Sequence, residues 1–525
     1  MRVRVPPLAL FFINLHKIVD QNNKKLLFLI FFFYLLIFLF TAEGHVESID
    51  AQLRFEMTKS MVDKRSLEVD YFLARKGKDG RYYNTYGPIT SLLAVPFYLI
   101  AKAVYNLTNL EKKGVEEFMF SMMTPILGAI TVLIFFLFCL KVMRFNYKKS
   151  FIASILFSFF TPFWFYTKYS ANEVPCALFS LIGFYFLLKT EKNSKDLFLS
   201  GLGFGLAYLT RWEFAILFPP IFIWVIYRYF PQVKPILLFS SGIFPIFLLG
   251  IFYSYTIFGS PFFSYGEPKG FEEYIPRSLN LSWFFSYFFS FPPLKGFYRR
   301  LFSFEQGIFT YSPFIFFFIN GFYQLLKKER SIFFLFLFVI FVWVIFYTFI
   351  GPKGVEMGPR YHIPILFIFV SCSLYPLKNY FLKLFFYFFV FISFIINFLG
   401  INVSSHRTHL KLELIYRKNP PSGWVIQEER LFNMISGCFE VWRNYIKKSS
   451  KDYFFSREDA SVEERLEKQA TIALPNFWWI FLPFFGVPKF IILLSISIFL
   501  ILIFYSGLKI RSFLFYLDKF YNMKI

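Results

Sequence analysis

Residues 44–96 form a polar stretch in a chain whose neighbouring segments are almost wholly apolar. The stretch begins directly after the first apolar segment, so we expect it to be the first large loop to leave a membrane. Asp50 follows that segment closely, which places its carboxylate near the membrane surface. Tyr83 and Tyr86 lie on the returning part of the loop. A carboxylate at the lipid–water boundary beside a tyrosine-rich return indicates chemistry at that interface.

Further charged residues fall at the ends of apolar segments, on the same predicted side of the membrane. They are Lys168, Glu173, Arg211, Lys353, Glu356 and Arg360. A charge at the bilayer centre costs about 2.5–3.5 kcal/mol on insertion scales, and ionisable residues in membranes are kept mostly for function. At the end of a span, a long side chain can extend its charged end into water, so the free-energy cost of the charge is small. A single charged residue there is therefore weak evidence for a functional site. Their accumulation on one side is stronger evidence for a polar site there.

The composition is that of a membrane protein. Apolar residues make up 57% of the 525 residues, charged residues only 17%, and Phe alone numbers 85; soluble domains do not have this composition. The formal charge of +23 would indicate a nucleic-acid partner in a soluble protein. Here the enrichment of Lys and Arg in cytoplasmic loops explains it, and no nucleic-acid partner is expected.

The sequence gives no sign of a cofactor. The four cysteines form no disulfide framework, and no Cys or His cluster has metal-ligand spacing. Walker, Rossmann and zinc motifs are also absent from the sequence. We therefore predict no cofactor and assign no metal ligand, and a dependence on a divalent metal is left open.

Apolar runs predict an all-α polytopic membrane protein with about twelve transmembrane helices. The predicted spans are residues 26–42, 116–140, 150–167, 173–189, 197–210, 213–230, 235–257, 313–326, 331–350, 361–376, 383–401 and 487–508. The connections predicted to be cytoplasmic are rich in Lys and Arg, whereas the short outer connections hold only Lys168, Arg211, Lys353 and Arg360. This asymmetry predicts that both termini are cytoplasmic in the inner (plasma) membrane.

The spans divide the chain into five regions. Residues 1–42 are a cytoplasmic lead and the first transmembrane helix, and residues 43–115 are the first outer, periplasmic loop. Residues 116–401 are the transmembrane core, with an outer loop at 258–312. Residues 402–475 are a further outer loop, and residues 476–525 are the final transmembrane helix and a cytoplasmic tail. Residues 90–104 and 431–446 have the pattern of interfacial helices in the two outer loops.

Several stretches resemble integral-membrane glycosyltransferases of the C-type superfamily, which includes protein O-mannosyltransferases and the lipid A aminoarabinose transferase. They are residues 48–56 (SIDAQLRFE), 80–88 (GRYYNTYGP), 92–98 (LLAVPFY), 172–175 (NEVP), 201–211 (GLGFGLAYLTR), 304–313 (FEQGIFTYSP) and 358–361 (GPRY). The resemblance covers roughly residues 26–400. Many relatives have Glu after the loop aspartate, where this chain has Ala51, so a pair of acids is not expected.

The resemblance implies inverting transfer of a sugar from a polyprenyl-phosphate donor to a lipid, glycan or protein acceptor on the outer face. A glycoside hydrolase needs a carboxylate on each side of the sugar. Transfer from a lipid phosphate needs one base and cations for the departing phosphate, because the phosphate is already a good leaving group. Asp50 is the candidate base, and the planar guanidinium of Arg360 suits the phosphate.

The remaining candidates for substrate binding are less specific. They are the cations Lys168, Arg211 and Lys353, the acids Glu173 and Glu356, and Tyr83 and Tyr86. Most of the candidates also have a simpler interpretation. Asp50 could be a solvated acid and Arg360 an interfacial anchor. The two glutamates could form structural ion pairs, and the tyrosines could belong to an aromatic belt.

The main alternative function is a transporter or flippase for lipid-linked sugars. Such a protein typically has polar residues near the middle of the membrane and interrupted helices in matching halves. The sequence predicts neither feature, and the long first outer loop has no evident use in transport. An enzyme is therefore favoured.

Overall fold

The chain is almost entirely helical wherever the structure, a computed structural model, describes it: residues 21–71, 74–108, 110–189, 194–260, 292–349, 358–404, 430–446, 475–481 and 488–522. Helices are the expected form for apolar segments, because inside a bilayer each backbone polar group must be paired within its own segment or barrel. The first half contains α2 (Gln21–Phe40), α3 (Ile49–Asp63), β1 (Arg75–Lys76), β2 (Tyr82–Tyr83), α4 (Ile89–Leu107), α5 (Lys112–Ser121), α6 (Met123–Lys141), α7 (Tyr147–Phe159), α8 (Phe163–Lys168), α9 (Glu173–Leu188), α10 (Ser194–Thr210), η1 (Trp212–Leu217), α11 (Phe218–Tyr229) and α12 (Val233–Phe258). The second half contains α14 (Pro293–Leu301), α15 (Ile308–Tyr311), η2 (Pro313–Phe317), α16 (Phe318–Lys328), α17 (Arg330–Phe349), η3 (Arg360–Ile365), α18 (Leu366–Ser373), α19 (Tyr380–Ile401), α22 (Arg430–Ile446), α24 (Trp478–Phe481) and α25 (Lys489–Asn522).

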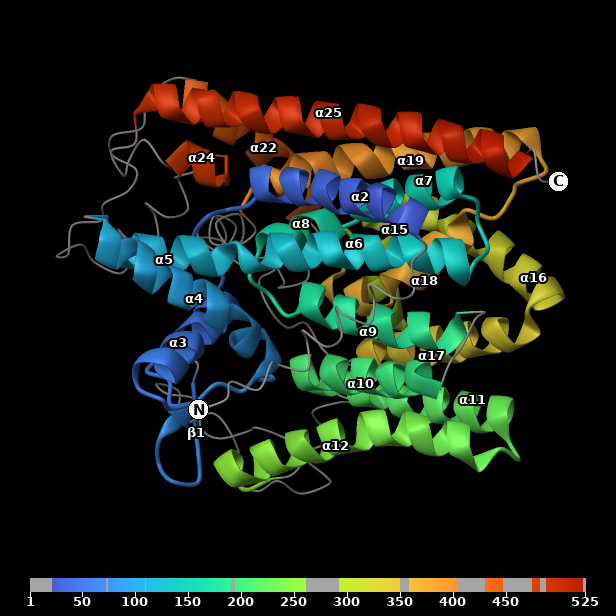
Figure 1. Ribbon diagram of the computed structural model, residues 1–525, viewed down its shortest axis with the longest axis horizontal. Helices are drawn as coiled ribbons and strands as arrows, with labels where there is room; N and C mark the ends of the chain where they lie inside the picture. Colours follow the sequence, from blue (N-terminus) through green and yellow to red (C-terminus); the bar gives the residue numbers. More distant parts are fainter. Residues whose placement is uncertain are drawn as a thin grey trace.

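The long helices form a bundle and extend in nearly the same direction (Figure 1). Helix α2 packs against α6 and α25, and α10 packs against α9 and α12. Helices α2 and α25 are antiparallel, because the ring of Phe40 lies 6.2 Å from that of Phe499 and Phe33 faces Gly507. The start of α2 and the end of α25 therefore lie at the same end of the bundle.

Membrane-spanning character is clear in several helices. Six helical segments of the described residues are long and apolar enough to cross a membrane: Ile89–Leu107, Lys112–Lys141, Val233–Phe258, Arg330–Phe349, Tyr380–Ile401 and Lys489–Phe515. Large apolar side chains are exposed on the surface of the bundle, for example Phe252 (65%), Phe391 (61%) and Ile501 (66%). Such a surface suits contact with lipid rather than water. The chain is thus a multi-pass membrane protein.

Several predicted spans are interrupted, which differs from the expectation of continuous helices. The span 150–167 is divided into α7 and α8 before Pro162, and 213–230 into η1 and α11 before Pro219 and Pro220. The spans 313–326 and 361–376 begin as the 3₁₀ segments η2 and η3, which contain Pro313 and Pro364. Proline removes a backbone donor and its ring clashes with the preceding turn, so the α-helix breaks there. Transporters also contain interrupted helices, so this feature does not distinguish an enzyme from a transporter here.

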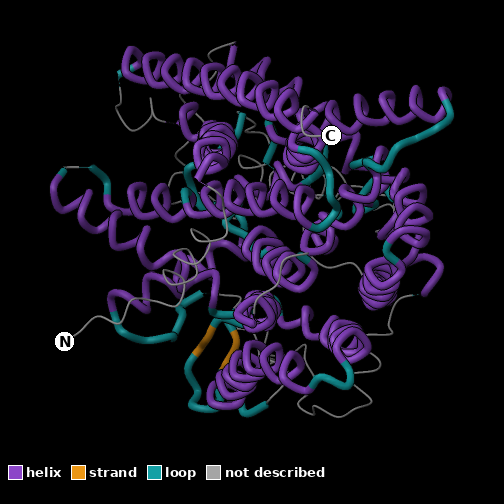
Figure 2. Tube along the Cα trace, turned by 45° about the vertical axis from the view of Figure 1, so that its right-hand side comes forward, coloured by secondary structure: helices purple, strands orange, loops and turns teal. Residues whose placement is uncertain are grey.

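The first outer loop has its own folded structure at one end of the bundle. Helices α3, α4 and α5 pack in sequence, and β1 pairs with β2 in a small antiparallel hairpin that Figure 2 shows in orange. The predicted interfacial helix at 90–104 is part of α4, which has 19 residues and reaches a spanning length. The predicted helix at 431–446 is present as α22, which packs against α19.

Candidate functional site

Asp50 lies in the first turn of α3. Ser48 caps this helix, since its hydroxyl accepts a hydrogen bond from the Ala51 backbone N–H at 3.2 Å. The unpaired N–H groups of a helix start favour a nearby negative charge, so this turn suits an ionised carboxylate. Arg54 lies one turn further along the same face, and its guanidinium lies 4.5 Å from the centre of the Tyr86 ring.

The segment that presents Tyr86 is held by contacts on both sides. The Trp212 indole N–H donates to the carbonyl of Thr85 at 3.0 Å, and the Tyr86 backbone N–H donates to the side chain of buried Asn84 at 2.9 Å. Gly87 packs directly on the end of α10, where an added Cβ would lie 1.8 Å from the carbonyl oxygen of Leu209. These contacts fix the position of the tyrosine ring.

The Asp50 carboxylate links Tyr86 to Arg360. The Tyr86 hydroxyl donates to Oδ1 of Asp50 at 2.5 Å, and Nη1 of Arg360 lies 3.5 Å from Oδ2. The contact with Arg360 is long for a hydrogen bond, whereas the tyrosine contact is short. The structure thus joins the predicted base and the predicted phosphate cation, which are far apart in the sequence.

Tyr86 keeps its proton in this setting. Burial raises the pKa of Tyr86 well above its usual value, and the negative charge of Asp50 raises it further. A neutral phenol can only donate to a carboxylate, so Tyr86 fixes the orientation of the Asp50 side chain. The second oxygen of Asp50 remains directed toward Arg360.

Arg360 belongs to a cluster of guanidinium groups around the ring of Tyr361. Its Nη2 donates to the Tyr361 hydroxyl at 3.0 Å. The guanidinium carbons of Arg360, Arg300 and Arg211 lie 4.8, 4.6 and 5.2 Å from the centre of that ring. Arginines pack on aromatic faces through cation–π attraction, and a group of them favours an anion nearby. We call Asp50, Tyr86, Arg360, Tyr361 and Arg300 the acid–arginine site.

Arg300 is positioned by close packing of α14 on α17. An added Cβ at Gly296 would lie 1.8 Å from the carbonyl oxygen of Thr348, so only glycine permits this approach. The Arg300 guanidinium donates to the carbonyl of Tyr347 at 2.9 Å and to the side chain of Gln306. Its neighbour Arg299 is instead bound in a two-point ion pair by Glu305.

The other predicted site residues have different positions. Glu173 pairs with Arg211 at 3.1 Å, which agrees with the structural interpretation, although Arg211 also contacts Tyr361. Lys168 donates to the carbonyls of Ile401 and Val403 at the end of α19. Tyr83 pairs with Arg75 in the hairpin, its hydroxyl donates to Asp79, and its ring packs against Phe258. Lys353 and Glu356 lie outside the described residues.

The sequence did not identify Arg54, Arg300 and Tyr361 as site residues. Arg54 and Tyr361 lie within the quoted motifs, four residues after Asp50 and directly after Arg360, so their spacing was a usable signal. The Arg299–Arg300 pair lies in the predicted outer loop 258–312, where positive charge is less expected, which was a second signal. In the part of the chain that the structure describes, no group of three or more His, Cys, Asp or Glu side chains could hold a metal ion.

Replacing Gly87 by Ala is expected to displace Tyr86 from Asp50. The new Cβ would clash with the carbonyl of Leu209. Because this carbonyl is part of the backbone of α10, relieving the clash would require a backbone shift. We expect a less stable protein, by about 1–3 kcal/mol as for other overpacked sites, measured by thermal unfolding in detergent. Gly80→Ala is the control, because nothing lies within 4 Å of its Cβ position, although its positive φ adds a local strain. An equal effect of the two changes would contradict the importance of this packing.

A comparison with protein-family models gives a match to part of the chain. Residues 91–251 match the family model described as dolichyl-phosphate-mannose-protein mannosyltransferase. A search of curated proteins gives no match.

Two solved structures match this chain with TM-scores below 0.5. ArnT from Cupriavidus metallidurans, bound to undecaprenyl phosphate, is 10% identical, with a TM-score of 0.44 over 84% of this chain and 83% of that one. The archaeal oligosaccharyltransferase AglB from Archaeoglobus fulgidus, in complex with an inhibitory peptide and a dolichol-phosphate, is 13% identical, with a TM-score of 0.46 over 86% and 64%. Residues 91–251 thus have the sequence pattern of the dolichyl-phosphate-mannose-protein mannosyltransferases, and the predicted resemblance to C-type glycosyltransferases is confirmed.

Proposed function

We propose that the protein is an inverting glycosyltransferase that moves a sugar from a polyprenyl-phosphate donor to an acceptor on the outer face of the membrane. The observation that supports it most directly is the contact of Asp50 with Tyr86 and Arg360, a carboxylate and a cation brought together at one end of the bundle. The family match at residues 91–251 supports a donor of the same chemical class, a sugar on a polyprenyl phosphate.

The proposed step uses one base. The Asp50 carboxylate accepts a proton from the acceptor hydroxyl or amine, and the freed electron pair attacks the anomeric carbon from the face opposite the phosphate. The bond from that carbon to the phosphate oxygen breaks, and its electron pair stays on the phosphate. The products are the glycosylated acceptor and the polyprenyl phosphate, with the configuration at the anomeric carbon inverted.

Arg360 and Arg300 are suited to the phosphate. Negative charge grows on the departing phosphate in the transition state, so guanidinium groups fixed beside it lower the barrier. Tyr361 holds both arginines by its ring, which reduces the reorganisation needed during the reaction. Tyr86 orients Asp50 and keeps one carboxylate oxygen turned toward the arginines.

The Lys and Arg distribution supports an outer site in the plasma membrane. The acid–arginine site lies at the end of the bundle where the predicted outer connections meet. The donor would then bind with its chain in the outer leaflet, and a lipid, glycan or protein acceptor would approach from outside.

The test uses the purified protein and a set of β-linked hexosyl and pentosyl polyprenyl phosphates, with cell-envelope extract as the acceptor source. We expect release of polyprenyl phosphate with one donor and an α-linked product, identified by the anomeric coupling constant in NMR. A β-linked product would contradict inversion. Donor movement across vesicles without release of polyprenyl phosphate would instead indicate a flippase.

A further inference from the structure

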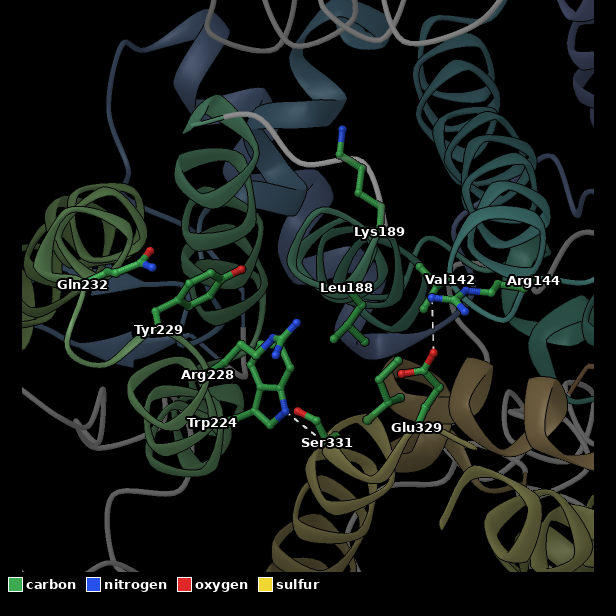
Figure 3. Close-up of a pocket in the computed structure, with 11 residues that line it drawn as sticks. Val142, Arg144, Leu188, Lys189, Trp224, Arg228, Tyr229, Gln232, Glu329 and Ser331 are labelled. Carbon is green, nitrogen blue, oxygen red and sulfur yellow. Dashed lines mark hydrogen bonds and ion pairs between the residues drawn. The ribbon is translucent and has the colours of Figure 1, made fainter. Parts of the chain in front are cut away.

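A cavity of about 510 Å³ lies at the opposite end of the bundle. Its wall includes Arg144, Leu188, Lys189, Arg228, Glu329 and Ser331 (Figure 3). Helix α9 begins at Glu173, beside Arg211 of the first site's cluster, and ends at Leu188 in the cavity wall. At about 1.5 Å per residue its length separates the two sites by roughly 24 Å. The cavity is therefore no part of the acid–arginine site.

Basic side chains surround this cavity. Arg144 pairs with Glu329 at 3.2 Å, and Lys189 directs its ammonium to buried Asp196 at 2.7 Å, away from both arginines in Figure 3. Arg228 makes no ion pair with any described residue. The cavity thus has more positive than negative charge, and Arg228 is available to an anion.

The backbone at Arg144 is in a conformation that favours glycine. Its φ is +55°, where the chain leaves α6 and the Phe145 N–H donates back to the Cys139 carbonyl at 3.0 Å. Helices usually place glycine at this position, because a Cβ is unfavourable there. An arginine at this position keeps a guanidinium at the cavity in spite of that disadvantage.

Two more features favour an anion. Helix α17 starts at Arg330, so the backbone N–H groups of its first turn, which includes the lining residues Ser331 and Ile332, have no partner within the helix. The Ser331 hydroxyl is buried and makes no hydrogen bond with the described residues. The Trp224 indole donates to the Ser331 carbonyl at 2.8 Å, which holds α11 against the start of this helix.

The surroundings indicate that the anion belongs to a lipid. Ile223, Tyr227 and Phe230, which flank the cavity residues of α11 in sequence, are 66%, 75% and 76% exposed. Apolar and aromatic side chains of this kind lie at the lipid surface of membrane proteins. The cavity residues of α11 therefore lie beside the lipid-facing side chains of the same helix.

We propose that this cavity binds the phosphate headgroup of an anionic lipid in the leaflet opposite the acid–arginine site. Arg144 and Arg228 contact the phosphate, together with the first turn of α17 and the Ser331 hydroxyl. The acyl chains lie along the exposed apolar side of α11. By the predicted topology this leaflet is the cytoplasmic one, where anionic lipids attract basic residues.

The test measures thermal unfolding of the full-length protein in detergent with short-chain phosphatidylglycerol, phosphatidylcholine or inorganic phosphate. We expect only phosphatidylglycerol to raise the unfolding temperature in a saturable manner, because a ligand of the folded state stabilises it. In the double variant Arg144→Gly and Arg228→Gln the concentration for half-saturation should rise at least about fivefold. Glycine suits the backbone at position 144, so folding is retained.

The control is Lys327→Gln with Lys328→Gln, which removes the same charge from exposed residues of α16 outside the cavity. It should saturate at the same concentration as the parent protein. The proposal would be overturned if the concentration for half-saturation rose equally in both double variants, or did not rise in the cavity variant. Saturation by inorganic phosphate at the same concentration would assign the cavity to a soluble phosphate and would also overturn it.

Discussion

Asp50→Asn is expected to abolish sugar transfer while donor binding and membrane insertion stay near those of the parent protein. Asparagine has nearly the same shape as aspartate, and its amide oxygen can still accept the hydrogen bond from Tyr86. Only the ability to take a proton is lost. General bases contribute about 10²- to 10⁴-fold to the rate, so turnover should fall by that factor.

The measurement follows release of polyprenyl phosphate from the donor in membranes that contain equal amounts of each variant. Glu56→Gln is the matched control, because Glu56 lies in the same helix and its carboxylate accepts from Gln52 at 3.0 Å rather than facing Arg360. It should retain most of the activity. If Asp50→Asn turned over normally while Glu56→Gln was inactive, the base would be misassigned. If both were active, the chemistry would lie outside this helix.

The sequence predicted that Asp50 and Arg360 lie on the same side of the membrane, but not that they are in contact. Both lie at ends of apolar segments on one predicted side of the membrane, and a bundle brings all such ends into one layer. The contact of 3.5 Å between these residues agrees with that reasoning. The ends of apolar segments can be predicted from hydropathy, so a single sequence can indicate that two such ends share a layer.

Side-chain partners within that layer were not predictable in the same way. Lys168 and Arg360 have the same predicted depth, but Lys168 binds the carbonyls of Ile401 and Val403. Predicting this contact requires knowing that α19 ends beside α8. Tyr83 and Tyr86 come from one motif, yet Tyr83 lies in the β2 strand and bonds to Asp79. Contacts between distant segments decide these positions, and a single sequence does not contain them.

The interruptions of the helices coincide with prolines, which a prediction based on hydropathy alone does not take into account. Pro162 and Pro364 lie in apolar runs that hydropathy alone treats as continuous. The breaks have a structural use. Lys168 ends the short helix after Pro162, and Arg360 begins the 3₁₀ segment that contains Pro364. A broken helix is tolerated at membrane depth where protein surrounds it.

The second large effect is expected for Arg360→Lys. Lysine keeps the positive charge but has no planar fork, so it cannot donate two parallel hydrogen bonds to a phosphate. It also loses the packing on the Tyr361 ring, which now lies 4.8 Å from the guanidinium. One charged hydrogen bond contributes about 1.5–3 kcal/mol, so kcat/KM for the donor should fall roughly tenfold to a hundredfold.

Steady-state kinetics with varied donor concentration measures this effect, with thermal unfolding as the check on folding. Arg81→Lys is the control, because Arg81 is an exposed arginine of the predicted first outer loop whose ion pairs with Glu68 and Asp79 are long, at 3.9 Å. Its kinetics should match those of the parent protein. Unchanged donor kinetics in Arg360→Lys would show that Arg360 does not bind the donor phosphate and would leave only a role as an anchor at the membrane interface.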